Sequence, residues 1–198
     1  MIRHAGRVLC LIVGACAMAT GQESAPPSAT ANWDFSVWAA WATGEETRNS
    51  FTQVHTWTAG GFIGHEVTGE IGEGWHSGNL EWGATLIPVF VQTKLHTISG
   101  GGFEPVVLRW NSGLHLGRAR PYIELAGGGV FTNANLPPGN TSSFNFSARG
   151  GGGVSLVTKR RQSLDISCRW YHVSNANMGS WNPEFNGIQL GLGYHWFK

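Results

Sequence analysis

The chain has 198 residues, of which only 13% are charged, whereas glycine occurs 29 times and tryptophan 10 times. This composition is unlike that of an ordinary soluble helical or α/β domain. The formal net charge is +1 and the sequence contains no basic cluster of the kind that binds nucleic acid, so we expect no nucleic-acid partner.

The first 19 residues have the pattern of a secretory signal peptide. Arg3 and Arg7 precede the apolar run 8–13, and residues 17–19 form an A-x-A cleavage sequence. Cys16 also ends a sequence that resembles a lipoprotein cleavage box, which leaves lipid modification of this cysteine as an alternative. Both interpretations place the mature chain outside the cytoplasm.

Residues 20–31 are rich in Ser, Ala and Pro and show no periodicity, so we expect a disordered tether that precedes a folded region at 32–198. After the signal, no apolar run approaches the roughly 20 residues that a membrane-spanning helix needs. Insertion into a membrane would therefore use strands. Cleavage after residue 19 leaves Cys168 as the single cysteine, which precludes a disulfide within the mature chain.

From residue 32 onward, apolar and polar residues alternate in eight segments. In the first segment Trp33, Phe35 and Val37 share one face, and Asp34 and Ser36 share the other, which is the period of a two-faced β-strand. An even number of antiparallel strands of about 10 residues is typical of the smallest outer-membrane barrels. The fold class that we predict is all-β, an eight-stranded antiparallel transmembrane β-barrel. The expected strands are 32–42, 53–65, 77–92, 104–116, 121–131, 143–158, 162–173 and 186–197.

The connections predict an orientation. The longer loops 43–52, 93–102, 132–142 and 174–185 alternate along the chain with the turns 117–120 and 159–161 and with the longer connection 66–76. If both termini face the periplasm, the longer loops lie outside, as in other outer-membrane barrels. Within the third strand, the apolar phase predicts that Leu80, Leu86 and Phe90 face outward.

The polar phase of the strands carries charged residues that would share a narrow interior. Because unpaired charges are costly to bury, we expect salt bridges and a side-chain-filled lumen in place of an open pore. The seven residues are Asp34, Glu81, Glu124, Asp165, Arg109, Arg149 and Arg169.

His172 and Ser174 stand out at the end of the seventh strand. They continue the apolar phase of Leu164, Ile166 and Trp170, so they project from the outer face next to a polar loop. Side chains two residues apart on a strand share a face, close enough for an imidazole to bond a hydroxyl. The pair therefore suggests a serine nucleophile with a histidine base, although His-x-Ser alone is a weak signal.

The sequence His172-Val173-Ser174-Asn175-Ala176, followed by Asn182-Pro183 and a last alternating strand, resembles the outer-membrane lipid A 3-O-deacylase family. The resemblance implies an eight-stranded barrel of the bacterial outer membrane that removes the ester-linked 3-hydroxyacyl chain of lipid A, part of lipopolysaccharide. It also implies that Ser174 is the nucleophile, that His172 is the base, and that Asn175 and nearby backbone amides bind the oxyanion.

The chain departs from the family pattern at the residue that orients the histidine. The family's Glu position falls on Asn186, and Glu184 lies two residues earlier in the same strand phase. An amide oxygen accepts a hydrogen bond from an imidazole but stabilises imidazolium less than a carboxylate does. The sequence leaves Asn186 and Glu184 as alternatives.

Two other functions remain open at this stage. A non-enzymatic small outer-membrane barrel, structural or adhesive, would use loops 43–52 and 132–142 to bind a partner and would leave His172 and Ser174 without a role. An acyltransferase would use the same nucleophile but needs an acceptor. The reaction requires no cofactor, no histidine spacing indicates a metal site, and the sequence does not define the oligomeric state.

Overall fold

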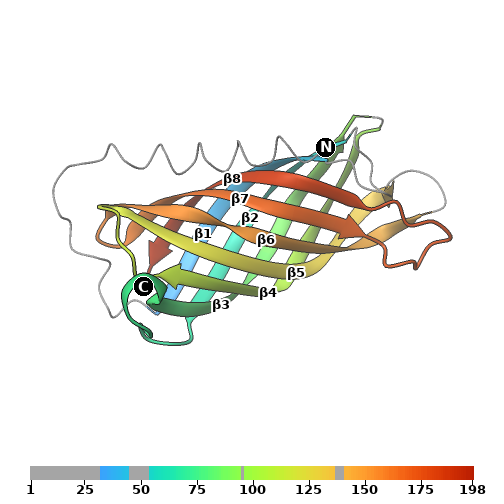
Figure 1. The fold of residues 1–198 in the computed structure, drawn as a ribbon. Coiled ribbons are helices and arrows are strands. Elements are labelled where there is room, and N and C mark those ends of the chain that lie inside the picture. The colour runs from blue at the N-terminus through green and yellow to red at the C-terminus, as the bar shows by residue number, and fades with distance from the viewer. Residues whose placement is uncertain (1–31, 45–53, 95, 137–140) are drawn as a thin grey trace, which may run out of the picture.

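The alternating segments form eight antiparallel strands that close into a barrel (Figure 1). The computed structural model describes residues 32–44, 54–94, 96–136 and 141–198, so the predicted signal peptide and tether lie outside the described residues. The predicted number and direction of the strands are confirmed. The strands are β1 (Trp33–Gly44), β2 (His55–Glu66), β3 (Gly78–Thr93), β4 (Ile98–Ser112), β5 (Ala119–Leu136), β6 (Ser142–Lys159), β7 (Gln162–Ser174) and β8 (Phe185–Phe197).

Each strand pairs with its neighbours in sequence, and β1 pairs with β8 to close the sheet, with Asp34 opposite Phe197. Closure leaves no strand edge with unpaired backbone groups. In the described ranges no helix is long and apolar enough to cross a membrane. The helix that these ranges contain is the short 3₁₀ turn Gly74–His76, between β2 and β3.

The period of two separates the barrel surface from its interior. On β7, Leu164 and Ile166 are exposed on the outer face, whereas Asp165, Ser167 and Arg169 are buried inside. This is the arrangement predicted from the sequence, with the apolar phase outside and the charged phase inside.

Strand boundaries differ from the prediction around β4 and β5, while the other strands begin and end within two residues of the expected positions. The glycine-rich segment around Gly100 was expected to be a loop, but β4 already begins at Ile98 and ends at Ser112, and β5 continues to Leu136. A side chain at Gly100 would collide with the backbone of Phe131 on β5. Glycine here permits a close approach of two strands, which a sequence pattern does not distinguish from a loop.

Register shifts also reverse the facing of two residues. Phe90 was expected outside but is buried within the barrel, because the pairing of β3 with β4 shifts between Ile87 and Phe90. A second shift, between Phe103 and Val106, turns Glu104 inward, where it is fully buried. An extra residue in one strand reverses the alternation beyond it.

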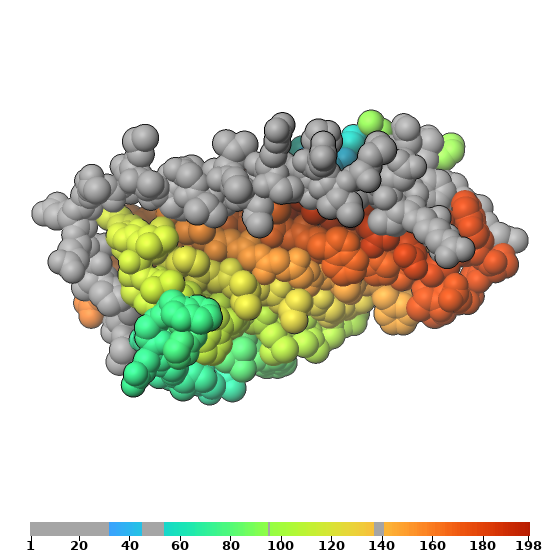
Figure 2. All heavy atoms as spheres, in the orientation of Figure 1, coloured from blue at the N-terminus to red at the C-terminus, as the bar shows by residue number. Residues whose placement is uncertain are grey.

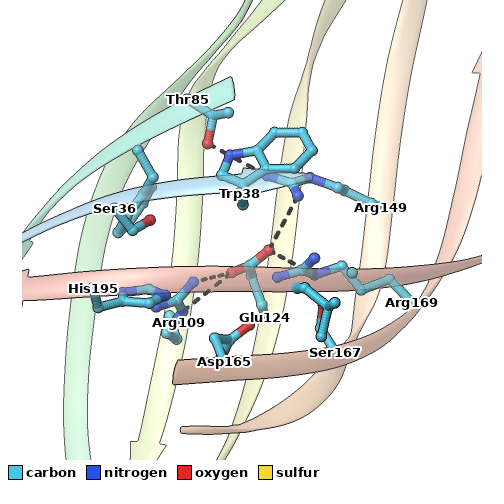
Figure 3. Close-up of a pocket in the computed structure, with 13 residues that line it drawn as sticks. Ser36, Trp38, Thr85, Arg109, Glu124, Arg149, Asp165, Ser167, Arg169 and His195 are labelled. Carbon is cyan, nitrogen blue, oxygen red and sulfur yellow. Dashed lines mark hydrogen bonds and ion pairs between the residues drawn. The ribbon is translucent and has the colours of Figure 1, made fainter. Parts of the chain in front are cut away.

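The predicted interior salt bridges converge on Glu124 (Figure 3). Its carboxylate lies 2.7 Å from Arg109 Nη2, 3.1 Å from Arg169 Nε and 3.7 Å from Arg149 Nη1. Arg149 also pairs at 2.5 Å with Glu104, a partner that the sequence did not predict. All four side chains of the Glu124 cluster are buried, and Glu104 and Asp34, which pair with Arg149 and Arg109, bring the carboxylates to three against the three guanidinium groups.

The other interior acids have different partners. Asp34 lies 2.7 Å from His195 Nδ1 and 3.4 Å from Arg109. Glu81 accepts a hydrogen bond from Asn111, and Asp165 accepts one from the Tyr122 hydroxyl, so neither forms the ion pair expected for it among the described residues. The cavity beside Glu124 encloses about 10 Å³, roughly the space of one water molecule. This small volume supports a filled lumen, which stays a prediction for the barrel as a whole.

The two ends of the barrel are built differently. The C-terminus and the connections 67–77, 113–118 and 160–161 lie at one end, which we call the turn end, and the β7–β8 connection 175–184 lies at the other, the loop end (Figure 1). Inside the loop end, apolar side chains replace the charges. This apolar plug comprises Ala42, Val54, Phe90, Ile98, Val130, Leu136, Tyr171, Val173 and Phe185.

We expect Glu124→Ala to destabilise the barrel by about 3–5 kcal/mol, because three buried guanidinium groups lose their shared counter-charge. Urea-induced unfolding in lipid vesicles, followed by tryptophan fluorescence, measures this free energy. Glu73→Ala, which removes an exposed acid at the turn end, is the control and should change the free energy of unfolding little. Equal free energies of unfolding for the two variants would contradict the predicted contribution of the Glu124 cluster to stability.

Candidate active site at the junction of β7 and β8

The register between β7 and β8 brings the sequence-predicted site residues together. His172 lies directly opposite Asn186, and both follow the outward phase of their strands. The inward neighbours of these residues, Tyr171 and Phe185, belong to the apolar plug and pack against each other with ring centroids 6.0 Å apart. Packing on the inner face therefore fixes the strands whose outer face carries the polar groups.

Ser174, His172 and Asn186 form a hydrogen-bonded chain. Ser174 Oγ lies 2.9 Å from His172 Nε2, and His172 Nδ1 lies 2.8 Å from Asn186 Oδ1. Because Oδ1 only accepts, Nδ1 carries the proton, and Nε2 is left to accept the hydrogen bond from the serine hydroxyl. This is the arrangement of an activated serine, with a base to take its proton and an acceptor that orients the base.

The structure distinguishes the positions of the two candidate orienting residues. Asn186 contacts His172 directly and is only 7% exposed. Glu184 contacts Asn186, whose Nδ2 donates a long hydrogen bond of 3.4 Å to Glu184 Oε2. The amide of Asn186 thus contacts the imidazole of His172, and the carboxylate of Glu184 lies on the far side of that amide.

Asn175 occupies a different position from the one expected for an oxyanion donor. Its backbone N–H donates to Asn182 Oδ1, its side-chain amide donates to the carbonyl of Trp181, and its Oδ1 accepts from the N–H of Asn177. The residue is 1% exposed. Its polar groups therefore hold the loop together in this conformation instead of pointing at a substrate.

The segment after Ser174 is a tight turn. The N–H of Met178 donates to the carbonyl of Asn175, and the two central residues, Ala176 and Asn177, have φ angles of 50° and 63°. Left-handed backbone is unfavourable for alanine by roughly 1–2 kcal/mol, so the contacts of Asn175 must hold the turn. Ala176, two residues after Ser174, is exposed, whereas the N–H groups of Asn175, Asn177 and Met178 already donate within the loop.

An apolar groove beside the site was not found from the sequence. It has a volume of about 230 Å³ and lies on the outer face, where Ala148 pairs with His172 and Gly150 pairs with Trp170. The indole of Trp170 stacks on the His172 ring, with centroids 5.3 Å apart. The sequence feature that could have indicated the groove is the pair of small outward residues on β6, Ala148 and Gly150. Only the pairing of β6 with β7 shows that they lie beside His172. The groove is lined by Val106, Leu108, Leu125, Ala126, Ala148, Arg149, Gly150 and Trp170.

Exposed apolar side chains continue from the groove over the barrel wall. Figure 2 shows part of the outer surface of β4 to β8, with the β7–β8 connection projecting at the loop end. Within that connection Met178 and Trp181 are both exposed.

In the part of the chain that the structure describes, no three His, Cys, Asp or Glu side chains are placed to hold a metal ion. The prediction that no metal takes part stays untested.

Comparisons with known proteins agree with this architecture. Residues 28–195 match the family model described as lipid A 3-O-deacylase (PagL). The crystal structure of the outer membrane enzyme PagL aligns with a TM-score of 0.59 at 18% identity, covering 80% of this chain and 97% of that one. The outer membrane protein OprG from Pseudomonas aeruginosa aligns with a TM-score of 0.52 at 10% identity, covering 85% and 97%. No curated protein matches the sequence. At these identities the structural matches establish the fold alone.

We expect Asn175→Ala to loosen the turn without unfolding the barrel, because the substitution removes the two side-chain bonds to Trp181 and Asn177. Hydrogen–deuterium exchange with mass spectrometry should show faster exchange over 175–184 and unchanged exchange in β1 to β6. Met178→Ala is the matched control, since it shortens an exposed side chain of the same turn, at a residue without a positive φ angle, and keeps the backbone bond to Asn175. Unchanged exchange in the Asn175 variant would show that this residue does not hold the loop.

Proposed function

The chain belongs to the lipid A 3-O-deacylase family, because the family model covers most of its length, and from this premise we propose that Ser174, His172 and Asn186 carry out the ester hydrolysis. The family consists of ester hydrolases in β-barrels of the outer membrane, which is the fold and compartment of this chain. The proposed substrate is the 3-O-linked acyl chain of lipid A. The observation that carries the assignment is the Ser174–His172–Asn186 chain on the outward face.

The chemistry follows from the protonation pattern of His172. Ser174 Oγ attacks the ester carbonyl carbon while its proton moves to His172 Nε2, and the carbonyl oxygen becomes an oxyanion. When the C–O bond breaks, Nε2 returns the proton to the departing sugar hydroxyl and leaves an acyl-serine. Water then attacks with the same base, which releases the fatty acid and restores the hydroxyl of Ser174.

Asn186 orients the base in this scheme. Its oxygen holds the proton on His172 Nδ1, so that Nε2 faces Ser174 in the tautomer that accepts a proton. The oxyanion would be bound by the backbone N–H of Ala176, since the N–H groups of Asn175, Asn177 and Met178 donate within the loop. The resemblance to the family implied the side chain of Asn175 as a donor, but its bonds to Trp181 and Asn177 support a bracing role in the turn instead.

The outward position of the site suits a lipid substrate. Polar groups on the lipid-facing side of a barrel are costly unless they serve a function. The groove lined by Leu108, Leu125 and Trp170 begins beside His172 and offers apolar surface to an acyl chain whose ester reaches Ser174. A non-enzymatic barrel would have no use for either feature.

Ser174→Ala and His172→Ala should each lower release of 3-hydroxy fatty acid from lipid A by about 10³-fold or more, because either change removes the nucleophile or its base. Mass spectrometry of lipid A incubated with purified, detergent-folded protein measures the release. The double variant should lose little more than either single one, since the groups act as a unit. Asn186→Ala should lower kcat by about a hundredfold through loss of the productive tautomer.

Ser143→Ala provides the control, because this exposed serine lies on β6 near the same end of the barrel. Full hydrolysis by folded Ser174→Ala would disprove the proposed function and favour the binding barrel. Acyl chains found on a second lipid, instead of free fatty acid, would favour an acyltransferase.

Ala148→Leu should fill the groove beside His172 and lower kcat/KM for long-chain lipid A about tenfold or more, while hydrolysis of a short-chain ester changes little. Ala39→Leu adds the same bulk to the outer face of β1 and is the matched control. The same lipid A and short-chain esters serve for both variants. Equal losses with long and short chains would show that the groove does not bind the acyl group.

A further inference from the structure

The structure assigns a positioning role to Glu184, which acts on the reaction only through Asn186. We propose that Glu184 fixes the amide orientation of Asn186 and places a negative charge behind it, so that an amide performs the work of a carboxylate at His172. The inference rests on the proposed function of Ser174, His172 and Asn186. Among the described hydrogen bonds, Glu184 contacts Asn186, and Asn186 contacts the imidazole of His172.

Glu184 directly precedes β8 and shares the outward phase of Asn186. Glu184 and Asn186 are two residues apart, and Asn186 Nδ2 lies 3.4 Å from Glu184 Oε2 while Asn186 Oδ1 lies 2.8 Å from His172 Nδ1. The amide therefore bridges the carboxylate and the imidazole. Glu184 is half-buried and forms no ion pair in the described part of the chain.

An amide can be inserted between these groups in two orientations with almost the same shape. In one orientation the oxygen faces His172, and in the other the NH₂ group does, which would force Nδ1 to accept and would place the proton on Nε2. A protonated Nε2 in the neutral ring cannot take the proton of Ser174. The choice between orientations therefore decides whether the base works.

Glu184 removes this ambiguity because an ionised carboxylate only accepts hydrogen bonds. Turning the amide would bring Asn186 Oδ1 against the Glu184 oxygen, two acceptors with no proton between them. The orientation with Nδ2 toward Glu184 and Oδ1 toward His172 satisfies all three groups. A carboxylate directly against the imidazole would need no such partner, since both of its oxygens accept.

The charge of Glu184 has a second effect. As His172 takes the proton of Ser174 it becomes an imidazolium, and an amide alone stabilises this cation less than a carboxylate does. Glu184 polarises the Asn186 amide and supplies the negative charge one side chain further away. The acid missing from direct contact with His172 is thus replaced by an acid that acts across the amide.

The first test removes Glu184 in the natural background. Glu184→Ala should lower kcat for release of 3-hydroxy fatty acid about 10- to 100-fold with little change in KM, by analogy with the loss of a hydrogen-bond partner that orients a metal-binding histidine. Glu184→Gln should lose less, because its side-chain oxygen still accepts from Asn186. In an Asn186→Ala background, Glu184→Ala should have no further effect. Glu73→Ala is the control for loss of a remote acid.

The second test reverses the sign of the effect. In the Asn186→Asp variant a carboxylate already faces His172, and Glu184 becomes a like charge beside it. Adding Glu184→Ala to Asn186→Asp should therefore raise kcat, whereas the same change lowers kcat when Asn186 is present. Only a group that acts through residue 186 gives opposite effects in the two backgrounds, and Tm values for all variants verify that each barrel is folded.

Each outcome is informative. If Ser174→Ala abolishes hydrolysis and Glu184→Ala is fully active, the positioning role is wrong and the proposed function stands. If Glu184→Ala lowers kcat equally beside Asn186, Asn186→Ala and Asn186→Asp, Glu184 does not act through Asn186 and the inference is also overturned. If folded Ser174→Ala remains active, the proposed function itself fails, and the Glu184 variants cannot be the cause.

Discussion

The hydrogen-bond register between β7 and β8 is the constraint on which the candidate site depends. It places His172 opposite Asn186, and the neighbouring pair, Val173 and Phe185, points inward as part of the apolar plug. A slip of one residue would turn the polar groups into the barrel and the plug residues into the membrane. Because burial of the plug and exposure of the site belong to the same alternation, the packing that stabilises the loop end also fixes the geometry at Ser174.

The interior charges serve a different purpose from the polar groups outside. Glu124 and its three arginines lie deep in the lumen, where Glu104 and Asp34 supply the remaining counter-charges to Arg149 and Arg109. They are confined within a closed wall, where a lipid has no access. The Ser174–His172–Asn186 chain lies on the outer face of the same wall. The barrel wall thus separates the interior ion pairs from the polar chain of the candidate site.

The use of an amide at position 186 changes what the surroundings must provide. A carboxylate orients a histidine in either rotamer and supplies charge directly, whereas an amide requires a neighbour to select one orientation. Glu184, 3.4 Å behind the amide, has the chemistry for both requirements. Asn186 and Glu184, which the sequence leaves as alternatives, lie in series, with the amide between the imidazole of His172 and the carboxylate.

Much of the fold could be predicted from the sequence because strand alternation is a local property. The segments around Trp33 and Leu164, the inward arginines and the outward His172 and Ser174 all follow from a period of two within a single strand. Phe90 and Glu104 were misplaced or missed because a bulge reverses that period, and a bulge arises from pairing with another strand.

The sequence by itself determined the fold class, the two faces of the strands and the spacing of His172 and Ser174. Only the tertiary structure decided that Asn186 touches the histidine, that Glu184 lies behind Asn186, and that Ala148 opens a groove beside His172. The physical reason is that these relations join different strands or depend on side-chain placement at a strand end. Register and bulges in the closed sheet set them, and neither is encoded in the alternation of one segment.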